Sequence, residues 1–358
     1  MDYISWTLPG RPTHPSASVS VGSTDTLMPV LDPGQRVYVL ELGGEDDRFA
    51  AAEAGAAATD VSVLAPGIAL ARTVSPERLR GLAYTRRASD LLGHTDADVA
   101  SARVLLSASD VDVSGSVAVR ARDVRGTAGV DTREAERVLG DVLVARGFAI
   151  DLDDPDRELR VLFSDGVCAL GWLAVEADRG FGHRAPTDRP FFQPGSMDPL
   201  EARAVANLAG ARPGRTVLDP MCGTGGLLIE AGLVGADVVG LDAQSKMVRG
   251  TRENLAAFLD ADFAVARADA TRLPVADGAA AAVVLDVPYG RQSKVAGRGP
   301  DALVRGALAE ARRVADRGVL VADRSWAASC REAGWTVEAR FERRVHRSLT
   351  RHVHLLEA

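Results

Sequence analysis

The sequence predicts an α/β protein in which an N-terminal α+β half precedes a mostly parallel sheet with helices on both faces and an antiparallel hairpin at its end. Three observations predict this fold. From residue 215 onward, predicted strands and helices alternate, as in a doubly wound parallel sheet. The chain before residue 179 divides into two smaller α+β patterns. After Trp335, two strands follow each other without a helix between them.

The composition is that of a globular protein with two or three domains. Its 358 residues are 46% hydrophobic, which is enough for a sizeable core. No apolar run reaches the ~18 residues that a membrane span needs, and the start lacks a basic region followed by an apolar one. We therefore expect a cytoplasmic protein. Cys168, Cys222 and Cys330 are widely spaced and form no CxxC pair, so we expect neither disulfides nor a metal site.

The charge is distributed unevenly. The net charge of −7 argues against a protein that grips nucleic acid by bulk electrostatics. Residues 1–180 carry 18 basic and 28 acidic side chains, whereas residues 181–358 carry 24 and 21. A phosphate-facing surface in the second half would consist of arginines, because the half contains only two lysines, Lys246 and Lys294.

The first half is predicted to begin with a disordered extension, residues 1–34, which lacks sustained periodicity. Met28 is an alternative start of translation. We place one domain at 35–95 and a second at 96–178. In the second, Asp131 followed by Glu134 predicts a helix N-terminus, and Gly147 its end. The strands that we predict in this half are residues 36–42, 61–70, 82–85, 116–120, 159–163 and 167–175, with a helix after Gly44.

A linker, residues 179–197, is rich in Gly, Pro, Arg and Phe and leads to a domain at 198–358. Asp198 followed by Pro199 predicts the start of a helix. The predicted strands of this domain are 216–219, 237–242, 263–268, 280–286 and 318–323, and the predicted helices are 225–233, 245–258 and 300–314.

Four aspartates follow four successive strands of the predicted parallel sheet. They are Asp219, Asp242, Asp269 and Asp286. The carboxyl ends of parallel strands share one edge of the sheet, where nucleotide-like ligands bind. Glycines in the loop 219–225 allow a ligand to approach the backbone, although a mere tight turn would also use them.

The first loop points to a cationic cofactor. It lacks the lysine and hydroxyl of a phosphate-binding P-loop, and its first residue, Asp219, would repel a pyrophosphate. S-adenosylmethionine carries a sulfonium and an ammonium group, which an acidic loop tolerates. These residues resemble the class I methyltransferases. The resemblance implies that the loop, with Asp219, Pro220, Gly223 and Gly225, meets the methionine part of the cofactor.

The same resemblance assigns the later strand ends. It implies that Asp242, with Ala243 beside it, meets the ribose, and that Asp269 with Ala270 meets the adenine. The resulting fold is a Rossmann-like class I methyltransferase domain.

The fourth strand end carries a candidate substrate site. Asp286-Val287-Pro288-Tyr289 resembles the D/N-P-P-Y/F motif of methyltransferases that modify exocyclic base amines, with valine in place of the first proline. Asp286 and the carbonyl of Val287 would accept the two N–H bonds of such an amine and aim its lone pair at the methyl group. Tyr289 would stack on a base taken out of its helix, and Pro288 would stiffen the turn. An ordinary turn is the alternative.

The front half narrows the substrate. Residues from Ser116 to about 175 resemble a THUMP RNA-binding domain, and those from Arg36 to about 90 the ferredoxin-like unit that precedes it. The segments 184–186 and 189–197 look like the linker of archaeal tRNA (guanine-10, N2) methyltransferases. That family implies methylation of the guanosine 2-amino group at position 10 of tRNA, often to dimethylguanosine.

The expected partner is thus tRNA, with no membrane and no obligate protein partner. The candidate RNA-contacting arginines are Arg184, Arg189, Arg291, Arg344 and Arg347, each of which is alternatively a solvated surface charge. Three other functions stay open at this point: methylation of another RNA guanine, methylation of an adenine amine of DNA, and non-catalytic RNA binding.

Overall fold

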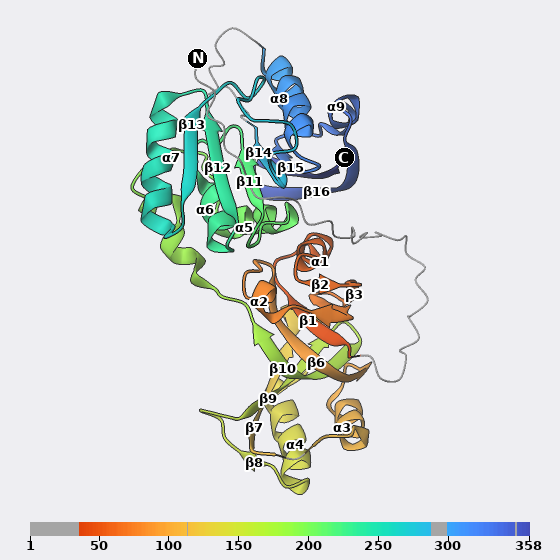
Figure 1. Cartoon of the computed structure of the whole chain (residues 1–358). Helices are drawn as coiled ribbons and strands as arrows, with labels where there is room; N and C mark the ends of the chain where they lie inside the picture. Colours follow the sequence, from red (N-terminus) through yellow and green to blue (C-terminus); the bar gives the residue numbers. More distant parts are fainter. Residues whose placement is uncertain (1–35, 113, 288–298, 348) are drawn as a thin grey trace. The chain divides into compact units, whose positions relative to one another are not determined.

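The chain folds into two compact units that divide at Arg179 and Gly180 (Figure 1). The computed structural model describes residues 36–112, 114–287, 299–347 and 349–358. The extension expected at residues 1–34 lies outside the described residues. Each unit has its own sheet and is described by itself below.

The first unit, residues 36–179, is built on one eight-stranded sheet. The strands of this unit are β1 (Tyr38–Leu42), β2 (Ala58–Thr59), β3 (Ser62–Ala65), β4 (Ile68–Ala71), β5 (Thr73–Val74), β6 (Thr85–Asp96), β7 (Ser116–Asp123), β8 (Ala149–Ile150), β9 (Arg157–Ser164) and β10 (Val167–Glu176). The sheet runs in the order β3-β4-β1-β6-β10-β9-β7-β8, and β2 and β5 form a separate pair. Because β6 pairs with β10, the segments 35–95 and 96–178 share this sheet.

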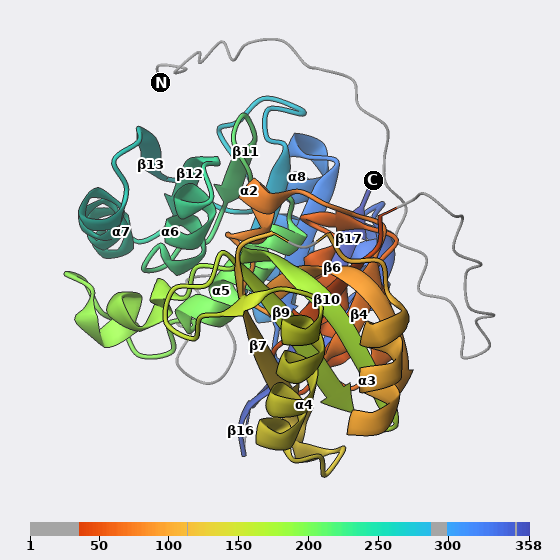
Figure 2. The same ribbon diagram turned by 90° about the horizontal axis from the view of Figure 1, so that it is seen from below.

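The helices of the first unit are α1 (Asp47–Ala54), α2 (Pro76–Leu79), α3 (Val99–Ala108) and α4 (Thr132–Ala145). Figure 2 shows α3 and α4 side by side against the strands. Leu106 of α3 and Leu139 of α4 are fully buried with Val161 of β9 in one core cluster. The predicted helix start is confirmed, because the Asp131 carboxylate accepts hydrogen bonds from the N–H groups of Arg133 and Glu134.

Two predictions for the first unit are wrong in detail. The single strand expected at 61–70 is a hairpin of β3 and β4, and Gly67 adopts a φ of 77° at its turn. The short strand expected at 82–85 ends where the 12-residue β6 begins. The residues of β6 include arginines, Ser89, Asp90 and Gly93, so this strand lacks the apolar run that predicts a buried strand.

The second unit, residues 180–358, contains the predicted doubly wound sheet. Its strands are β11 (Thr216–Asp219), β12 (Asp237–Asp242), β13 (Phe263–Arg267), β14 (Ala282–Asp286), β15 (Arg317–Ala322), β16 (Thr336–His346) and β17 (Leu349–Glu357). Its helices are α5 (Pro199–Leu208), α6 (Gly226–Leu233), α7 (Ser245–Phe258), α8 (Pro300–Val314) and α9 (Ala327–Glu332). All of these elements except α9 were predicted from the sequence.

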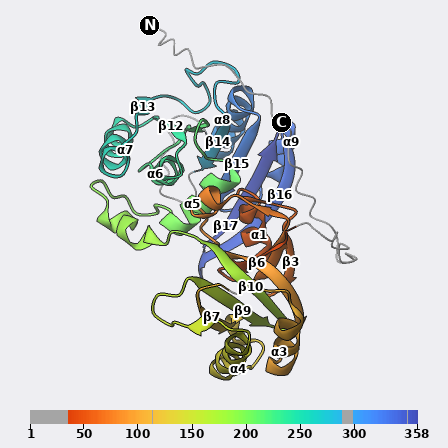
Figure 3. The ribbon, with the colours of Figure 1, turned by 60° about the horizontal axis from the view of Figure 1, so that its bottom comes forward.

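The seven strands lie in the order β13-β12-β11-β14-β15-β17-β16. The pairs from β13 to β15 are parallel, whereas β17 pairs antiparallel with both β15 and β16. Figure 3 shows the β16 and β17 arrows together. The strand order reverses at β11, which has β12 on one side and β14 on the other. Such a switch point is where ligands bind in open α/β sheets.

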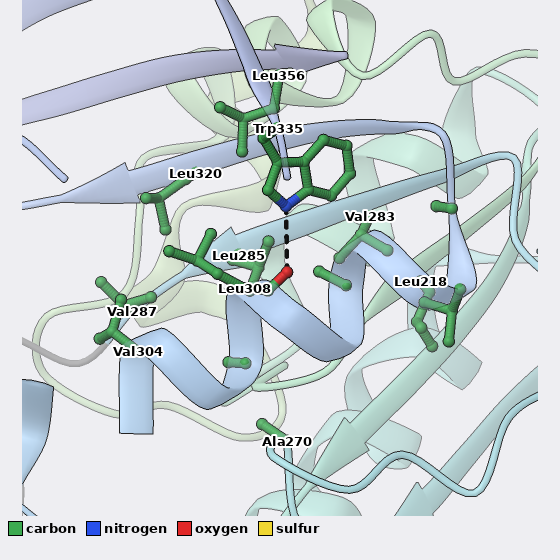
Figure 4. Packing of buried hydrophobic residues seen from close by; sticks show 14 of the residues in the cluster. Leu218, Ala270, Val283, Leu285, Val287, Val304, Leu308, Leu320, Trp335 and Leu356 are labelled. Carbon is green, nitrogen blue, oxygen red and sulfur yellow. Dashed lines mark hydrogen bonds between the residues drawn. The ribbon is translucent and has the colours of Figure 1, made fainter. Parts of the chain in front are cut away.

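Helices cover both faces of this sheet. Leu228 of α6 lies over Gly240 of β12, where an added Cβ would be 2.7 Å from the leucine Cδ1. On the other face, α8 packs into the core cluster shown in Figure 4. In this cluster, Trp335 lies against α8 and its indole N–H donates to the carbonyl of Leu308 (3.1 Å). Among the described residues, no helix has the length and apolar character needed to cross a membrane.

Candidate functional site

Three of the four predicted aspartates end neighbouring strands at the switch point. Asp219 ends β11, Asp242 ends β12 and Asp286 ends β14. Asp219 and Asp242 are buried, with 2% and 8% of their surface exposed. The parallel pairing of β11 with β12 and β14 brings the carboxyl ends of all three strands to one edge.

The loop after β11 connects two of these carboxylates. Asp219 Oδ1 accepts a hydrogen bond from the N–H of Met221 (3.0 Å), and Asp242 Oδ2 accepts one from the N–H of Gly223 (3.1 Å). Gly225, with a φ of 79°, precedes α6, and an added Cβ there would lie 2.9 Å from Thr251 Cγ2. The loop therefore requires glycine at this position for both its backbone conformation and its packing.

Burial raises the pKa values of the loop carboxylates. The pKa of Asp219 lies well above its usual range, first because of burial and then because Asp286 and Asp242 repel its negative charge. Burial also raises the pKa of Asp242, against hydrogen bonds from Gln244 and Gly223. A positively charged ligand at this edge would offset the repulsion. These residues thus fit a cofactor that carries cationic groups, as S-adenosylmethionine does.

The remaining predicted cofactor residues flank the same edge. Ala243, directly after β12, is exposed. Asp269, beyond β13, is also exposed, and its carboxylate accepts hydrogen bonds from the backbone N–H and the hydroxyl of Thr271 (both 2.8 Å). Ala270 and Pro220 are buried. The N–H of Ala268 donates to the carbonyl of Asp242, which ties the segment after β13 to the end of β12.

Asp286 carries a carboxylate oxygen that no described residue satisfies. Its Oδ1 is buried and has no hydrogen-bond partner in the described chain. Burial raises the pKa of Asp286 to about 6, and the positive charge of Arg351 acts in the opposite direction. Arg351 of β17 is 5% exposed. Asp286 pairs with Val321 of β15, and Val321 pairs with Val353 of β17. Arg351 lies two residues before Val353, so its side chain is on the same face of the sheet as that of Val353. A buried acceptor without a donor is costly, so this oxygen is suited to a ligand N–H.

Val287 has a packing role that explains its departure from proline. Its side chain is 2% exposed and belongs to the core cluster that contains Val304 of α8 (Figure 4). Its N–H donates to the carbonyl of Val321 at the end of β15 (3.1 Å). Proline has no N–H for that bond. The other predicted substrate residues, Pro288 and Tyr289, and the predicted RNA contact Arg291 lie outside the described residues.

The linker attaches to the loop after β11 through residues that the sequence pattern did not indicate. Asn254 of α7 accepts from the N–H of Phe191 and donates to the carbonyls of Phe191 and Thr224, all within 2.9 Å. The hydroxyls of Ser196 and Thr224 are 3.1 Å apart. Asn254 is fully buried in a helix, where its sequence position alone indicates a solvated residue. The linker thereby fixes the far side of the loop that precedes α6.

Two of the predicted RNA contacts need correction. The Arg184 guanidinium forms an ion pair with the fully buried Glu230 of α6 (2.8 Å). Arg189 is 4% exposed, and burial lowers its pKa. The sequence does not reveal these partners: the Glu230 carboxylate pairs with Arg184 and with Arg203. Arg189 Nε donates to the carbonyl of Arg184 (3.1 Å), and its two terminal nitrogens are buried without a hydrogen-bond partner among the described residues. By contrast, Arg344 and Arg347 are exposed at the end of the β16–β17 hairpin.

Comparison with known proteins identifies the family. The model of the RMKL-like methyltransferase domain family matches residues 186–353. The tRNA (guanine(10)-N2)-dimethyltransferase of Methanothermobacter thermautotrophicus is 38% identical over 286 residues, which cover 77% of this chain and 83% of that enzyme. The chain belongs to the tRNA (guanine(10)-N2)-dimethyltransferase family.

Two further proteins are similar in sequence to this chain. The tRNA (guanine(10)-N2)-dimethyltransferase of Pyrococcus abyssi is 31% identical over 255 residues, or 69% of this chain and 75% of that enzyme. The mouse U6 snRNA (guanine-N(2))-methyltransferase THUMPD2 is 30% identical over 168 residues, or 46% of this chain and 30% of that protein. The family model spans the strand ends that carry Asp219, Asp242 and Asp286.

Proposed function

We propose that the protein transfers a methyl group from S-adenosylmethionine to the exocyclic N2 amine of guanosine in tRNA, at position 10, giving N2-methylguanosine and, after a second transfer, N2,N2-dimethylguanosine. The unpartnered, buried Oδ1 of Asp286, next to an edge of acidic residues, carries this proposal. The choice of guanosine as the target and of tRNA as the substrate is taken from the names of the relatives.

In this proposal the loop after β11 binds the cofactor. Asp219, with Pro220, Gly223 and Gly225, faces the methionine part and its positive charge. Asp242 and Ala243 hold the ribose, and Asp269 and Ala270 border the adenine. When bound, S-adenosylmethionine supplies an electrophilic methyl group on a sulfonium. The buried carboxylates offer that cation a low-dielectric site with opposite charge.

Asp286 would hold the guanosine amine. The amine is a poor nucleophile because its lone pair is delocalised into the ring. Asp286 Oδ1 would accept a hydrogen bond from one N–H group of the amine, and the carbonyl of Val287 one from the other. These two hydrogen bonds would localise the lone pair on nitrogen and direct it at the methyl carbon. Positioning of this kind provides much of the rate acceleration in such displacements. The methyl group would pass to nitrogen as its bond to sulfur breaks, the electron pair of that bond would stay on sulfur, and the methylated amine would release its proton to water.

The target guanosine must leave its helix to reach this edge, because a base inside a duplex is inaccessible to the site. We propose that Tyr289 stacks on the extruded base and that Pro288 stiffens the turn. The proposed RNA contacts of this unit are Arg291, Arg344 and Arg347. The first unit would be a ferredoxin-like part (35–95) joined to a THUMP part (96–178) that docks the tRNA. We propose that the enzyme acts in the cytoplasm without an obligate protein partner.

One experiment tests the proposed reaction. The purified protein is incubated with unmodified tRNA transcripts and S-adenosylmethionine that carries a labelled methyl group, and the tRNA is digested to nucleosides. We expect label in N2-methylguanosine and N2,N2-dimethylguanosine. Label only in methyladenosine or methylcytidine would contradict the guanosine assignment. Transfer to DNA adenine without transfer to tRNA would favour a DNA methyltransferase, and binding of tRNA without any transfer would favour a non-catalytic RNA-binding protein.

A further inference from the structure

The sheet of the first unit carries a group of arginines around one buried glutamate. Glu41 of β1 is 2% exposed. Its carboxylate forms ion pairs with Arg160 of β9 (2.8 Å), Arg122 of β7 (3.5 Å) and Arg87 of β6 (3.7 Å). A single carboxylate neutralises one of these three charges. Arg160 also pairs with Glu158 (3.0 Å) and Arg87 with Glu176 (2.5 Å), and the arginines lie close together on the same part of the sheet.

Two more arginines extend this group. Arg120 of β7 is 3.8 Å from Glu158, which also pairs with Arg160. Burial, and after it repulsion by Arg86, lowers the pKa of Arg122. We call the five residues the Glu41 arginine cluster; they are Arg86, Arg87, Arg120, Arg122 and Arg160. The carboxylates in its ion pairs are Glu41, Glu158 and Glu176, so positive charge exceeds negative charge by two.

This excess is local, because the half of the chain that contains it carries 18 basic and 28 acidic side chains. On β7, Arg120 and Arg122 alternate with Val119 and Ala121, which belong to the core beneath α3 and α4. The arginines therefore lie on the opposite face of the sheet from those helices. The side chains of Arg120 and Arg122 are each 36% exposed and that of Arg87 is 25% exposed.

We propose that the Glu41 arginine cluster is a docking surface for the phosphate backbone of the RNA substrate; the proposal rests on the proposed function. The cluster spans the strands from β6 through β10 and β9 to β7. At ~4.8 Å between neighbouring strands, this is a width of about 14 Å, which is larger than one phosphate group and suits a run of phosphates. Planar guanidinium groups bind phosphate oxygens in pairs. Glu41 attracts the guanidinium groups of Arg87, Arg122 and Arg160 and orients them before the RNA arrives.

The test compares Arg120→Gln and Arg122→Gln with Arg103→Gln in the full-length protein. Arg103 is exposed on α3, on the helix-covered face, and serves as the matched control. The dissociation constant of an unmodified tRNA transcript is measured without cofactor at several salt concentrations. Each loss of a phosphate contact lowers the slope of log affinity against log salt by about 0.7 to 0.9. We expect this reduction, with affinity weakened about three- to tenfold, for both cluster variants.

The control variant should keep the affinity and the slope of the unchanged protein. An unchanged affinity and slope in both cluster variants would overturn the proposal. If the cluster variants kept their affinity and slope but unfolded at a lower temperature, the arginines would only stabilise the sheet through ion pairs. That outcome would also overturn the proposal. The binding measurement needs no methyl transfer. A protein that binds tRNA through this cluster but methylates no guanosine would therefore refute the proposed function and leave the docking surface standing.

Discussion

The most specific prediction concerns the protonation of Asp286. Its pKa is about 6, and a protonated carboxyl accepts a hydrogen bond from the guanosine amine less well than a carboxylate does. With this value, about 90% of the enzyme carries the carboxylate at pH 7 and about 10% at pH 5, so the rate of methyl transfer should fall about tenfold over this interval. The rate should be constant above about pH 7.

The assay is a single-turnover measurement of methyl transfer from labelled S-adenosylmethionine to tRNA between pH 5 and pH 8. Asp286→Asn provides the matched control, because asparagine keeps one acceptor oxygen and does not titrate. We expect this variant to be slower at pH 7 and to show no step near pH 6. Asp286→Ala should abolish transfer and retain most of the affinity for the cofactor. A wild-type rate that does not change between pH 5 and pH 7, or a step that persists in Asp286→Asn, would refute this reasoning.

Three further predictions concern the cofactor, the packing and the pH dependence of stability. Asp242→Ala should weaken S-adenosylmethionine binding about tenfold to a hundredfold in calorimetry, because charged hydrogen bonds contribute ~1.5–3 kcal/mol; equal affinity would remove Asp242 from the cofactor site. Gly250→Ala should destabilise the fold by ~1–3 kcal/mol in denaturant unfolding, since the new Cβ would lie 2.0 Å from Phe191 Cδ1. The control Gly140→Ala in α4 meets nothing within 4 Å and should not destabilise. Burial lowers the pKa of His354 from 6.5 to about 4, so the unfolded chain takes up a proton on His354 at a higher pH than the folded protein does. The contribution of the neutral His354 to stability is full above pH 6.5, and up to ~3 kcal/mol is lost as the pH falls to 4. His354→Leu should flatten this part of the pH profile, and an unchanged profile would contradict the assignment.

The second unit could be predicted almost completely from the sequence. Its strands alternate with helices; aspartates lie at the ends of strands, and glycines follow several helices. The hydrophobic pattern and the turn residues therefore indicate the same elements. Asp219, Asp242 and Asp286 were placed at one edge because parallel strands share their direction. Only α9 was missed, since its six residues are too short for helical periodicity to be recognised.

The first unit was less predictable because polar residues occupy its sheet. β6 contains Arg86, Arg87 and Asp90, and the ion pairs with Glu41 make such residues compatible with a strand. These partners are far apart in sequence, so a pattern within one segment cannot reveal them. Arg184 was misread for the same reason, because its buried partner Glu230 lies 46 residues away.

Whether Asp286 holds an exocyclic guanosine amine can be tested by one substitution in the substrate. A tRNA is assembled with inosine at the guanosine that the enzyme methylates; inosine keeps the purine ring, O6 and N1–H of guanosine but lacks the 2-amino group. The proposed chemistry predicts that this tRNA still binds, with an affinity reduced by the loss of the hydrogen bonds to Asp286 and Val287, and receives no methyl group at that nucleotide. Methyl transfer to the inosine at a rate similar to that for guanosine would contradict the claim, because the acceptor would then be another atom of the base or ribose.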